Sequence, residues 1–371
     1  MSDLLAPAQA LLISVLAVMP SHYQRDSLQA LLGLFLEAKG TPYPEHSHLK
    51  SSSALSRFLN RYSWPTRRVV RLVRRRVVNH LLAQRPKGRR PHLQVIVDLT
   101  CLPKRGKFKQ LGSLIRVFNR KRGLHLVVLY LVVGSWRLPW SWRIYRGKGE
   151  LTQVQLALGM IRALPRRLRQ HYQLIILADS AFGSGEFLHQ IRRLKCHAVV
   201  GTTKRRTLAD GRRITQLRHP GQQHYLNGMR VPVYIGWYWL KRDDGTRVKR
   251  FVLSTRRLKR GAIYFWGRRR WQIEGWFKTA KHRFGLHRFG QSTLQGIYRY
   301  LLVCMIAFVL AHWAYLLAGS PMALDWGQVA RDALEIFLPL VALALLLLEL
   351  ERLRPLARKH GISLQISRCK I

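Results

Sequence analysis

The chain has 371 residues, of which 65 are Lys or Arg and only 17 are Asp or Glu. Its formal net charge is therefore +48, and its sequence pI is about 11.6. Nearly half of the residues are hydrophobic, which excludes a disordered basic tail. Such an excess of positive charge is typical of a protein that binds a polyanion through its phosphates. The alternative is a ribosomal or otherwise solvated basic protein, a class that is usually shorter and less apolar.

The four cysteines stand far apart in the sequence, and no CxxC pair occurs. They are Cys101, Cys196, Cys304 and Cys369. This spacing predicts neither a disulfide framework nor a structural zinc site. No basic segment precedes the first apolar stretch, so we expect no signal peptide and a reducing, cytoplasmic location.

Residues 1–90 carry the pattern of a helical, basic domain. Apolar residues recur at helical spacing in Leu4–Met19 and Ser27–Ala38, and serines that suit a helix start precede a third segment at residue 51. After a break at residues 63–66, Arg67–Leu82 predicts a helix with an arginine face over an apolar face. The arginines expected to contact DNA are Arg71, Arg74 and Arg75. The pair of helices favours a helix-turn-helix-like reader of DNA bases, and a basic helix that touches only phosphates is the equal alternative.

A basic linker rich in Pro and Gly at residues 83–91 separates this domain from a region of strands and helices. The predicted strands are Leu93–Thr100, Leu124–Gly134, Arg137–Tyr145, Leu174–Asp179 and His197–Gly201, and the predicted helices are Thr152–Leu164 and Gly185–Leu194. This β-β-β-α-β-α-β order is typical of an α/β fold with a mixed sheet and helices packed against it.

The rest of the chain alternates between strand and helix patterns. Turn signals and short apolar runs at residues 204–258 predict a β-rich insertion, and helices resume at Gly261. The predicted domains are therefore residues 1–90, 91–203, 204–258, 259–320 and 321–371. Two apolar runs, Leu301–Ala318 and Ile336–Leu348, raise the alternative of a membrane protein, but a charge of +48 along the whole chain favours buried helices.

Three of the scarce acidic residues stand at positions suited to metal binding. Asp98 is predicted to end the first strand, Asp179 ends the strand at residues 174–178, and Glu274 lies in a helical segment. Each of them alone has an ordinary structural alternative: a turn or cap residue for an Asp, and an i,i+4 ion pair for the Glu. Together they predict a site at which Mg²⁺ or Mn²⁺ ions, roughly 3.5–4 Å apart, clamp the two oxygens of a phosphodiester displacement.

The order Asp, Asp, Glu on strand, strand and helix resembles that of the DDE transposases and retroviral integrases, which have an RNase H-like fold. Arg270, Glu274 and Lys281 match the spacing of the signature Tyr, Arg, Glu, Lys of the insertion-sequence-four type, and Gly267 stands at the position of the Tyr. Tyr264 stands three residues too early to replace it. The segments around Asp98, Asp179 and residues 282–289 are also similar, so the resemblance covers about residues 91–320.

The resemblance implies a cut-and-paste DNA transposase in which Asp98, Asp179 and Glu274 hold two Mg²⁺ or Mn²⁺ ions. Helical spacing places Arg270, Lys278 and Lys281 on the face of Glu274, where they would hold DNA phosphates. Lys278 has a simple ion pair with Glu274 as its alternative.

The same resemblance implies partners and further contacts. It predicts binding to transposon-end inverted repeats and target DNA, a homodimer formed with help from residues 321–371, and a place in the bacterial nucleoid. In the insertion, Trp237 or Trp239 would stack on a flipped base, although core packing is the more ordinary role of a strand aromatic. The rival functions are an RNase H-like nuclease without strand transfer and a catalytically degenerate DNA-binding repressor.

Overall fold

The computed structural model of the chain describes residues 2–37, 39–86, 88–105, 111–241, 244–318 and 326–365. The chain divides into two compact units. One consists of residues 81–279, and the other combines residues 1–80 with residues 280–371. The second unit thus draws its helices from both ends of the sequence, which the sequence pattern had assigned to separate regions.

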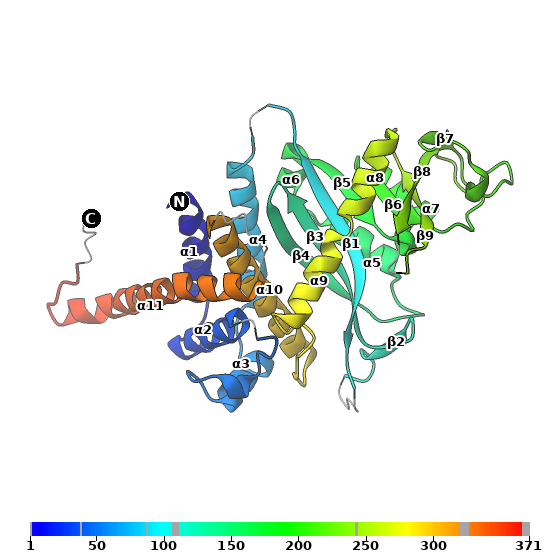
Figure 1. Ribbon diagram of the computed structural model, residues 1–371. Coiled ribbons are helices and arrows are strands. Elements are labelled where there is room, and N and C mark those ends of the chain that lie inside the picture. Colours follow the sequence, from blue (N-terminus) through cyan, green and yellow to red (C-terminus); the bar gives the residue numbers. More distant parts are fainter. Residues whose placement is uncertain are drawn as a thin grey trace. The chain divides into compact units, whose positions relative to one another are not determined.

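In the described part of residues 81–279, a nine-stranded mixed sheet forms the centre (Figure 1). Its strands are β1 (His92–Pro103), β2 (Arg116–Phe118), β3 (Lys121–Val133), β4 (Trp136–Tyr145), β5 (Gln173–Ala178), β6 (His197–Thr202), β7 (Gln222–His224), β8 (Val233–Lys241) and β9 (Arg247–Ser254). Strands β1, β5 and β6 are parallel, whereas β3 lies antiparallel between β1 and β4. The predicted mixed α/β sheet is confirmed, and its strands follow the order β2-β3-β1-β5-β6-β9-β8-β7, with β4 paired to β3.

Helices pack against this sheet. They are α5 (Gln153–Arg162), α6 (Arg166–His171), α7 (Gly185–Arg193), α8 (Arg260–Arg269) and α9 (Gln272–His282). Helix α5 contacts β3 and β4, α7 contacts β6, and α8 contacts β5, β6, β8 and β9. In Figure 1 the α8–α9 pair crosses in front of the sheet. A capping box between Thr152 and Gln155 starts α5 close to its predicted position.

The two-residue period of β1 turns one set of its side chains toward α8 and α9. The ring of His92 lies edge-on to Trp266 of α8, with 5.4 Å between ring centroids. Two residues later, Gln94 Oε1 accepts a hydrogen bond of 3.1 Å from Gln272 Nε2 of α9. Asp98 belongs to this same set, so the strand's own alternation presents its carboxyl group on the face that carries both helices.

The strands of the predicted insertion extend the central sheet. Strand β9 pairs antiparallel with β6, β8 pairs with β9, and the short β7 pairs with β8. A β-rich segment was expected here, but its continuity with the main sheet was not. Ser254 Oγ donates to Arg256 O at 2.7 Å where β9 ends and the chain turns back toward α8.

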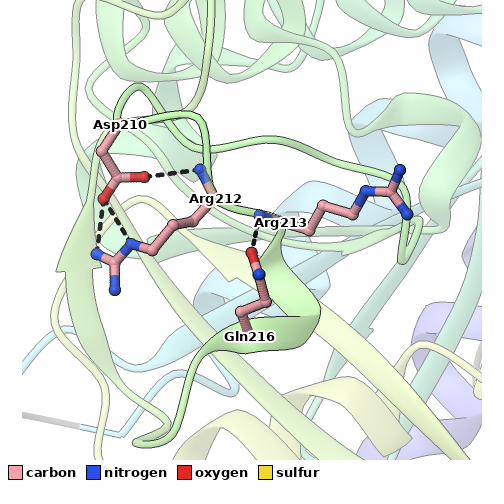
Figure 2. A network of polar contacts seen from close by, with 4 residues as sticks. All are labelled: Asp210, Arg212, Arg213 and Gln216. Atoms are coloured by element: carbon pink, nitrogen blue, oxygen red, sulfur yellow. Dashed lines mark hydrogen bonds and ion pairs between the residues drawn. The ribbon is translucent and has the colours of Figure 1, made fainter.

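Figure 2 shows an exposed turn in the loop that precedes β7. Asp210 accepts hydrogen bonds from the backbone N–H of Arg212 (3.0 Å) and from its guanidinium (2.6 and 2.9 Å). Gly211 adopts φ +85°, a left-handed conformation that glycine reaches without steric cost. The backbone N–H of Arg213 donates to Gln216 Oε1 at 2.7 Å. Asp210 therefore shapes a local turn, and hydrogen bonds from Arg212 lower its pKa below the usual value.

The other unit is helical in its described residues. Its helices are α1 (Ser2–Ala17), α2 (His22–Leu36), the short 3₁₀ helix η1 (Pro44–His46), α3 (Ser52–Asn60), α4 (Thr66–Ala83), α10 (Leu294–Ala318) and α11 (Trp326–Lys359). Side chains of Ser21 and Ser51 cap α2 and α3. Helix α10 contacts α1, α2, α3 and α11 and supplies much of this core.

Helix α10 contains the apolar run Leu301–Ala318 that raised the membrane alternative. By length and hydropathy, Leu294–Leu316 could cross a membrane, and 83% of the window tested is buried within the protein. A core helix passes the same test, so the finding is weak evidence for a membrane span. The second run, Ile336–Leu348, lies inside α11, where Pro339 does not end the helix.

Arg299 of α10 is fully buried beside the break between α3 and α4. Its guanidinium donates to four carbonyl oxygens, those of Phe58, Leu59, Tyr62 and Trp64, and to the hydroxyl of Thr66. It also lies 4.3 Å from the centroid of the Trp64 ring. Burial lowers the pKa of Arg299 to about 10, so it stays charged at neutral pH. A buried cation thus holds the loop from which the arginine-rich helix α4 starts.

Candidate active site

The register of β1 and β5 brings Asp98 and Asp179 to neighbouring positions. The two strands run parallel, and their last pair is Val97 with Ala178. Asp98 and Asp179 are the next residues on each strand. The prediction that Asp98 ends its strand is wrong, because β3 continues to pair with β1 as far as Pro103. Asp98 instead marks the point where β5 stops and one edge of β1 becomes free.

The two aspartates differ in their surroundings. The carboxyl side chain of Asp98 is 12% exposed, and its Oδ1 accepts a hydrogen bond of 2.8 Å from the backbone N–H of Leu99. Asp179 is half-buried, and its Oδ1 accepts from the N–H of Ala181 at 2.9 Å as the chain leaves β5. In each aspartate, one carboxylate oxygen therefore accepts a hydrogen bond from a backbone N–H group.

Arg270 joins the first aspartate to the glutamate. Its Nη1 lies 3.1 Å from Asp98 Oδ2 and 2.8 Å from Glu274 Oε1. The expectation that one helix carries Arg270 and Glu274 is wrong, since α8 ends at Arg269, and α9 begins at Gln272. Arg270 keeps helical dihedral angles at this junction, which preserves the i,i+4 contact.

The pKa of Asp98 is unusually high for an acidic residue in a highly basic protein. Burial is the largest cause that raises the pKa of Asp98 to about 7, and the negative charge of Asp179 is the next. Glu274 acts in the same direction, whereas Arg270 and the N–H of Leu99 lower the pKa. The carboxyl group of Asp98 is therefore close enough to those of Asp179 and Glu274 to be repelled by both, and a cation beside it would relieve that repulsion.

Arg270 supplies such a cation in this structure. In the described ranges, no three His, Cys, Asp or Glu side chains are arranged to hold a metal ion as they stand. The guanidinium instead bridges Asp98 and Glu274, and it shows that a positive group fits between these carboxylates. Oxygen donors of this kind suit Mg²⁺ or Mn²⁺, so the donor set fits the predicted metal.

Helix α9 presents a polar face that includes Glu274. Its buried side carries Ile273, Trp276, Phe277 and Ala280. The Trp276 ring stacks on Tyr130 of β3, with 5.5 Å between centroids. Lys278 is exposed and Lys281 half-buried on the opposite side, four and seven residues after Glu274. The predicted common face of Glu274, Lys278 and Lys281 agrees with this burial pattern.

A pocket of about 190 Å³ adjoins Asp179 and Arg270. Tyr238 of β8 and Arg250 of β9 form part of its wall, as does Gly267 of α8. Sequence reasoning missed Tyr238 and Arg250 as site residues, because only the pairing of β9 with β6 brings the insertion strands beside Asp179.

The other predicted DNA contacts have different surroundings. Trp237 packs under Lys249, whose Nζ lies 4.0 Å from the ring centroid, and it also contacts Phe251. That environment matches the packing alternative for Trp237. Trp239 is 57% exposed, as a residue that stacks on a base would be. Neither tryptophan is among the residues that line the pocket beside Asp179.

The arginines of the predicted DNA-binding helix lie on α4. Arg71 and Arg75 are exposed and Arg74 is half-buried, while Val69 and Val77 are buried on the opposite side. An arginine face over an apolar face was predicted, and the burial pattern shows it. These arginines belong to the helical unit, and the three acidic residues belong to the other.

Residues 92–310, more than half of the chain, match the family described as the transposase DDE domain. The chain belongs to this family. It is a transposase, an enzyme that cleaves DNA and transfers the cut strand. The insertion-sequence-four type is compatible with this match, and the family is generally dependent on divalent metal ions.

No curated protein matches the chain. Among solved structures, it is similar to a piggyBac transposase determined by cryo-EM as a synaptic complex with hairpin DNA. The TM-score is 0.48 at 12% identity, over 99% of this chain and 84% of that one.

Proposed function

We propose that Asp98, Asp179 and Glu274 are the catalytic carboxylates of this transposase and that they hold two Mg²⁺ or Mn²⁺ ions. The observation that carries the proposal is the guanidinium of Arg270 between Asp98 and Glu274, because it occupies a place where negative charges gather. Divalent cations at such carboxylates stabilise the attacking and leaving oxygens of a phosphodiester displacement.

The protein's own residues would position the DNA. A guanidinium binds phosphate oxygens as readily as carboxylate oxygens, so we expect Arg270 to turn to the scissile phosphate when metal and DNA enter. Lys278 and Lys281, on the polar face of α9, would contact phosphates of the same strand as point charges. The first cut would free a 3′-hydroxyl, and this hydroxyl would then attack a second phosphodiester.

The partners follow from the same chemistry. The substrates would be the inverted repeats at the transposon ends and a target duplex, bound by a homodimer that holds two ends together. The exposed arginines of α4 would contribute sequence-independent phosphate contacts. Such a protein would work in the cytoplasm, on the nucleoid.

The test is a strand-cleavage and strand-transfer assay with Mg²⁺ on duplexes that carry the inverted repeats flanking the reading frame. We expect Asp98→Asn, Asp179→Asn and Glu274→Gln each to lower cleavage by at least about 10³-fold while DNA binding persists. Asp210→Asn, which removes an exposed acid in the turn of Figure 2, is the matched control and should cleave normally.

Each outcome separates the candidate functions. Cleavage without joining by the unaltered chain would establish the nuclease. Binding without cleavage would establish the repressor. Unchanged cleavage by Asp98→Asn would contradict the assignment of the site.

A further inference from the structure

Two residues of the insertion strands face the pocket beside Asp179 and have no part in the proposed metal site. Tyr238 of β8 and Arg250 of β9 are directly opposite each other in the antiparallel register. Opposite residues point to the same face of a sheet, and both of these line the pocket together with Asp179 and Arg270. The pocket wall thus combines a phenol with two guanidinium groups.

Gly267 makes room for the Tyr238 ring. A Cβ atom at position 267 would lie 3.0 Å from Tyr238 Cε1, closer than an ordinary van der Waals contact. Gly267 lies inside α8, where a glycine costs roughly 1 kcal/mol relative to alanine. No positive φ requires glycine there, since Gly267 is not among the residues with that conformation. The close approach of the Tyr238 ring therefore explains why residue 267 is a glycine.

The hydroxyl of Tyr238 is available to a ligand. The ring is half-buried and packs edge-on against Tyr264, with 5.7 Å between centroids. In the part of the chain that the structure describes, the hydroxyl has no hydrogen-bond partner. A half-buried phenol that lines a pocket but leaves its polar end unused suits a ligand that accepts hydrogen bonds.

The size and charge of the pocket indicate which ligand that is. Its volume of about 190 Å³ is below the roughly 300 Å³ at which pockets for whole small molecules begin. Arg250 and Arg270 make the wall mainly positive around the single carboxylate of Asp179. A short, anionic part of a longer polymer fits these properties, and in a protein of charge +48 that polymer is a nucleic acid.

We propose that Tyr238 and Arg250 form a binding site for one phosphodiester of the DNA strand that is cut. In this site the Tyr238 hydroxyl donates a hydrogen bond to a phosphate oxygen, Arg250 supplies a charged contact, and Gly267 admits the ring. This inference rests on the proposed function, because it takes the strand beside Asp179 to be the substrate strand.

The test measures binding and cleavage with DNA ends in which single phosphates are replaced by neutral methylphosphonates. Binding is measured with Ca²⁺, and cleavage with Mg²⁺. For the unaltered protein, we expect one methylphosphonate position near the cleavage site to weaken binding by roughly 10-fold, the size of a lost hydrogen bond to a charged group. Tyr238→Phe should weaken binding of unmodified DNA by a similar factor and should lose most of its sensitivity to that position.

Matched variants control for indirect effects. Tyr234→Phe removes another β8 hydroxyl, one that donates to Gln223 instead, and should bind as the unaltered protein does. Arg250→Gln should lose the same methylphosphonate sensitivity, whereas Arg247→Gln, on the same strand, should keep it. Gly267→Ala should weaken binding in the presence of Tyr238 but have no further effect in Tyr238→Ala, because no ring is left to displace.

The results distinguish this inference from the proposed function. If the unaltered protein binds ends but does not cut them, the proposed function fails, and the Ca²⁺ binding data still decide the phosphate site. Equal binding of Tyr238→Phe and the unaltered protein at every methylphosphonate position would overturn the inference. A defect in Tyr238→Ala but not in Tyr238→Phe would show that the ring stacks on a base, and would also overturn it.

Discussion

Arg270 Nη1 lies 3.1 Å from Asp98 Oδ2, although 172 residues separate them in the sequence. Both side chains are largely buried, with exposed fractions of 16% and 12%. A buried ion pair stabilises a protein little, because desolvation of both charges offsets their attraction. The structure therefore gathers these charged groups at some cost in the free energy of unfolding.

The first prediction concerns that cost. Asp98→Asn removes a carboxyl group that burial and Asp179 make unfavourable to ionise. We expect the metal-free variant to be more stable than the unaltered protein at pH 7.5 by roughly 2–4 kcal/mol, while cleavage is lost. Urea denaturation in EDTA measures the free energy of unfolding. A variant that is less stable than the unaltered protein would contradict the prediction.

The second prediction follows from the pKa of Asp98, which is raised from about 3.8 to about 7. Between these values the folded protein binds a proton that the unfolded chain has released. The contribution of Asp98 to stability is therefore complete below about pH 4, falls as pH rises to about 7, and is then constant. The slope should be present in the unaltered protein without metal and absent in Asp98→Asn.

Divalent ions give the same prediction an independent check. Mg²⁺ or Mn²⁺ held by the ionised carboxylates, as proposed, should raise the melting temperature more at pH 8 than at pH 5. A metal effect that is equal at both pH values, or equal in Asp98→Asn, would show that the ions bind elsewhere.

The third prediction concerns Arg299, the buried cation at the break between α3 and α4. Arg299→Met keeps an apolar stem but removes a charged donor from four carbonyl oxygens. Those of Phe58 and Trp64 keep donors from Trp64 and Thr66, whereas those of Leu59 and Tyr62 lose the guanidinium. We expect a loss of about 3–5 kcal/mol in the free energy of unfolding. Arg288→Met, at an exposed position, is the control and should change stability by less than about 0.5 kcal/mol.

The fourth prediction concerns the proposed contact of α4 with DNA. If Arg71 and Arg75 contact only phosphates, Arg71→Ala and Arg75→Ala should weaken binding equally on specific and random duplexes. Each should also reduce the slope of log K against log salt by about 1. A loss confined to the specific duplex would instead establish base reading by a helix-turn-helix-like pair. Arg166→Ala, an exposed arginine on α6, controls for net charge.

Much of the sheet could be predicted from the sequence because its strands are strongly apolar. The run Leu174–Ala178 is apolar on both faces, as a central parallel strand must be, and Asp179 stands out at its end. The length of β1 could not be predicted, since it depends on pairing with β3 beyond Thr100. The two-residue periodicity and the composition of a strand indicate which of its faces is buried. The position at which the strand ends depends instead on its pairing with neighbouring strands.

The residue types of the site could be predicted from the sequence, but the contact between Arg270 and Asp98 could not. Glu274 and Lys278 are four residues apart, and helical geometry alone predicts that they share a face. The break before α9 was not predicted, because Arg270 and Trp271 are ordinary helix residues. Tyr238 and Gly267 meet only because β8 and α8 pack together, a long-range contact with no local signal.

The pairing of β9 with β6 has a consequence for engineering this protein. The segment 204–258 resembles a module that could be cut out, yet its last strand covers one side of β6. Removing it would leave four consecutive β6 residues, Val199–Thr202, with uncovered backbone donors and acceptors. An exposed apolar strand of this kind recruits other chains, so a shortened transposase is expected to self-associate into aggregates even with its three acidic residues intact.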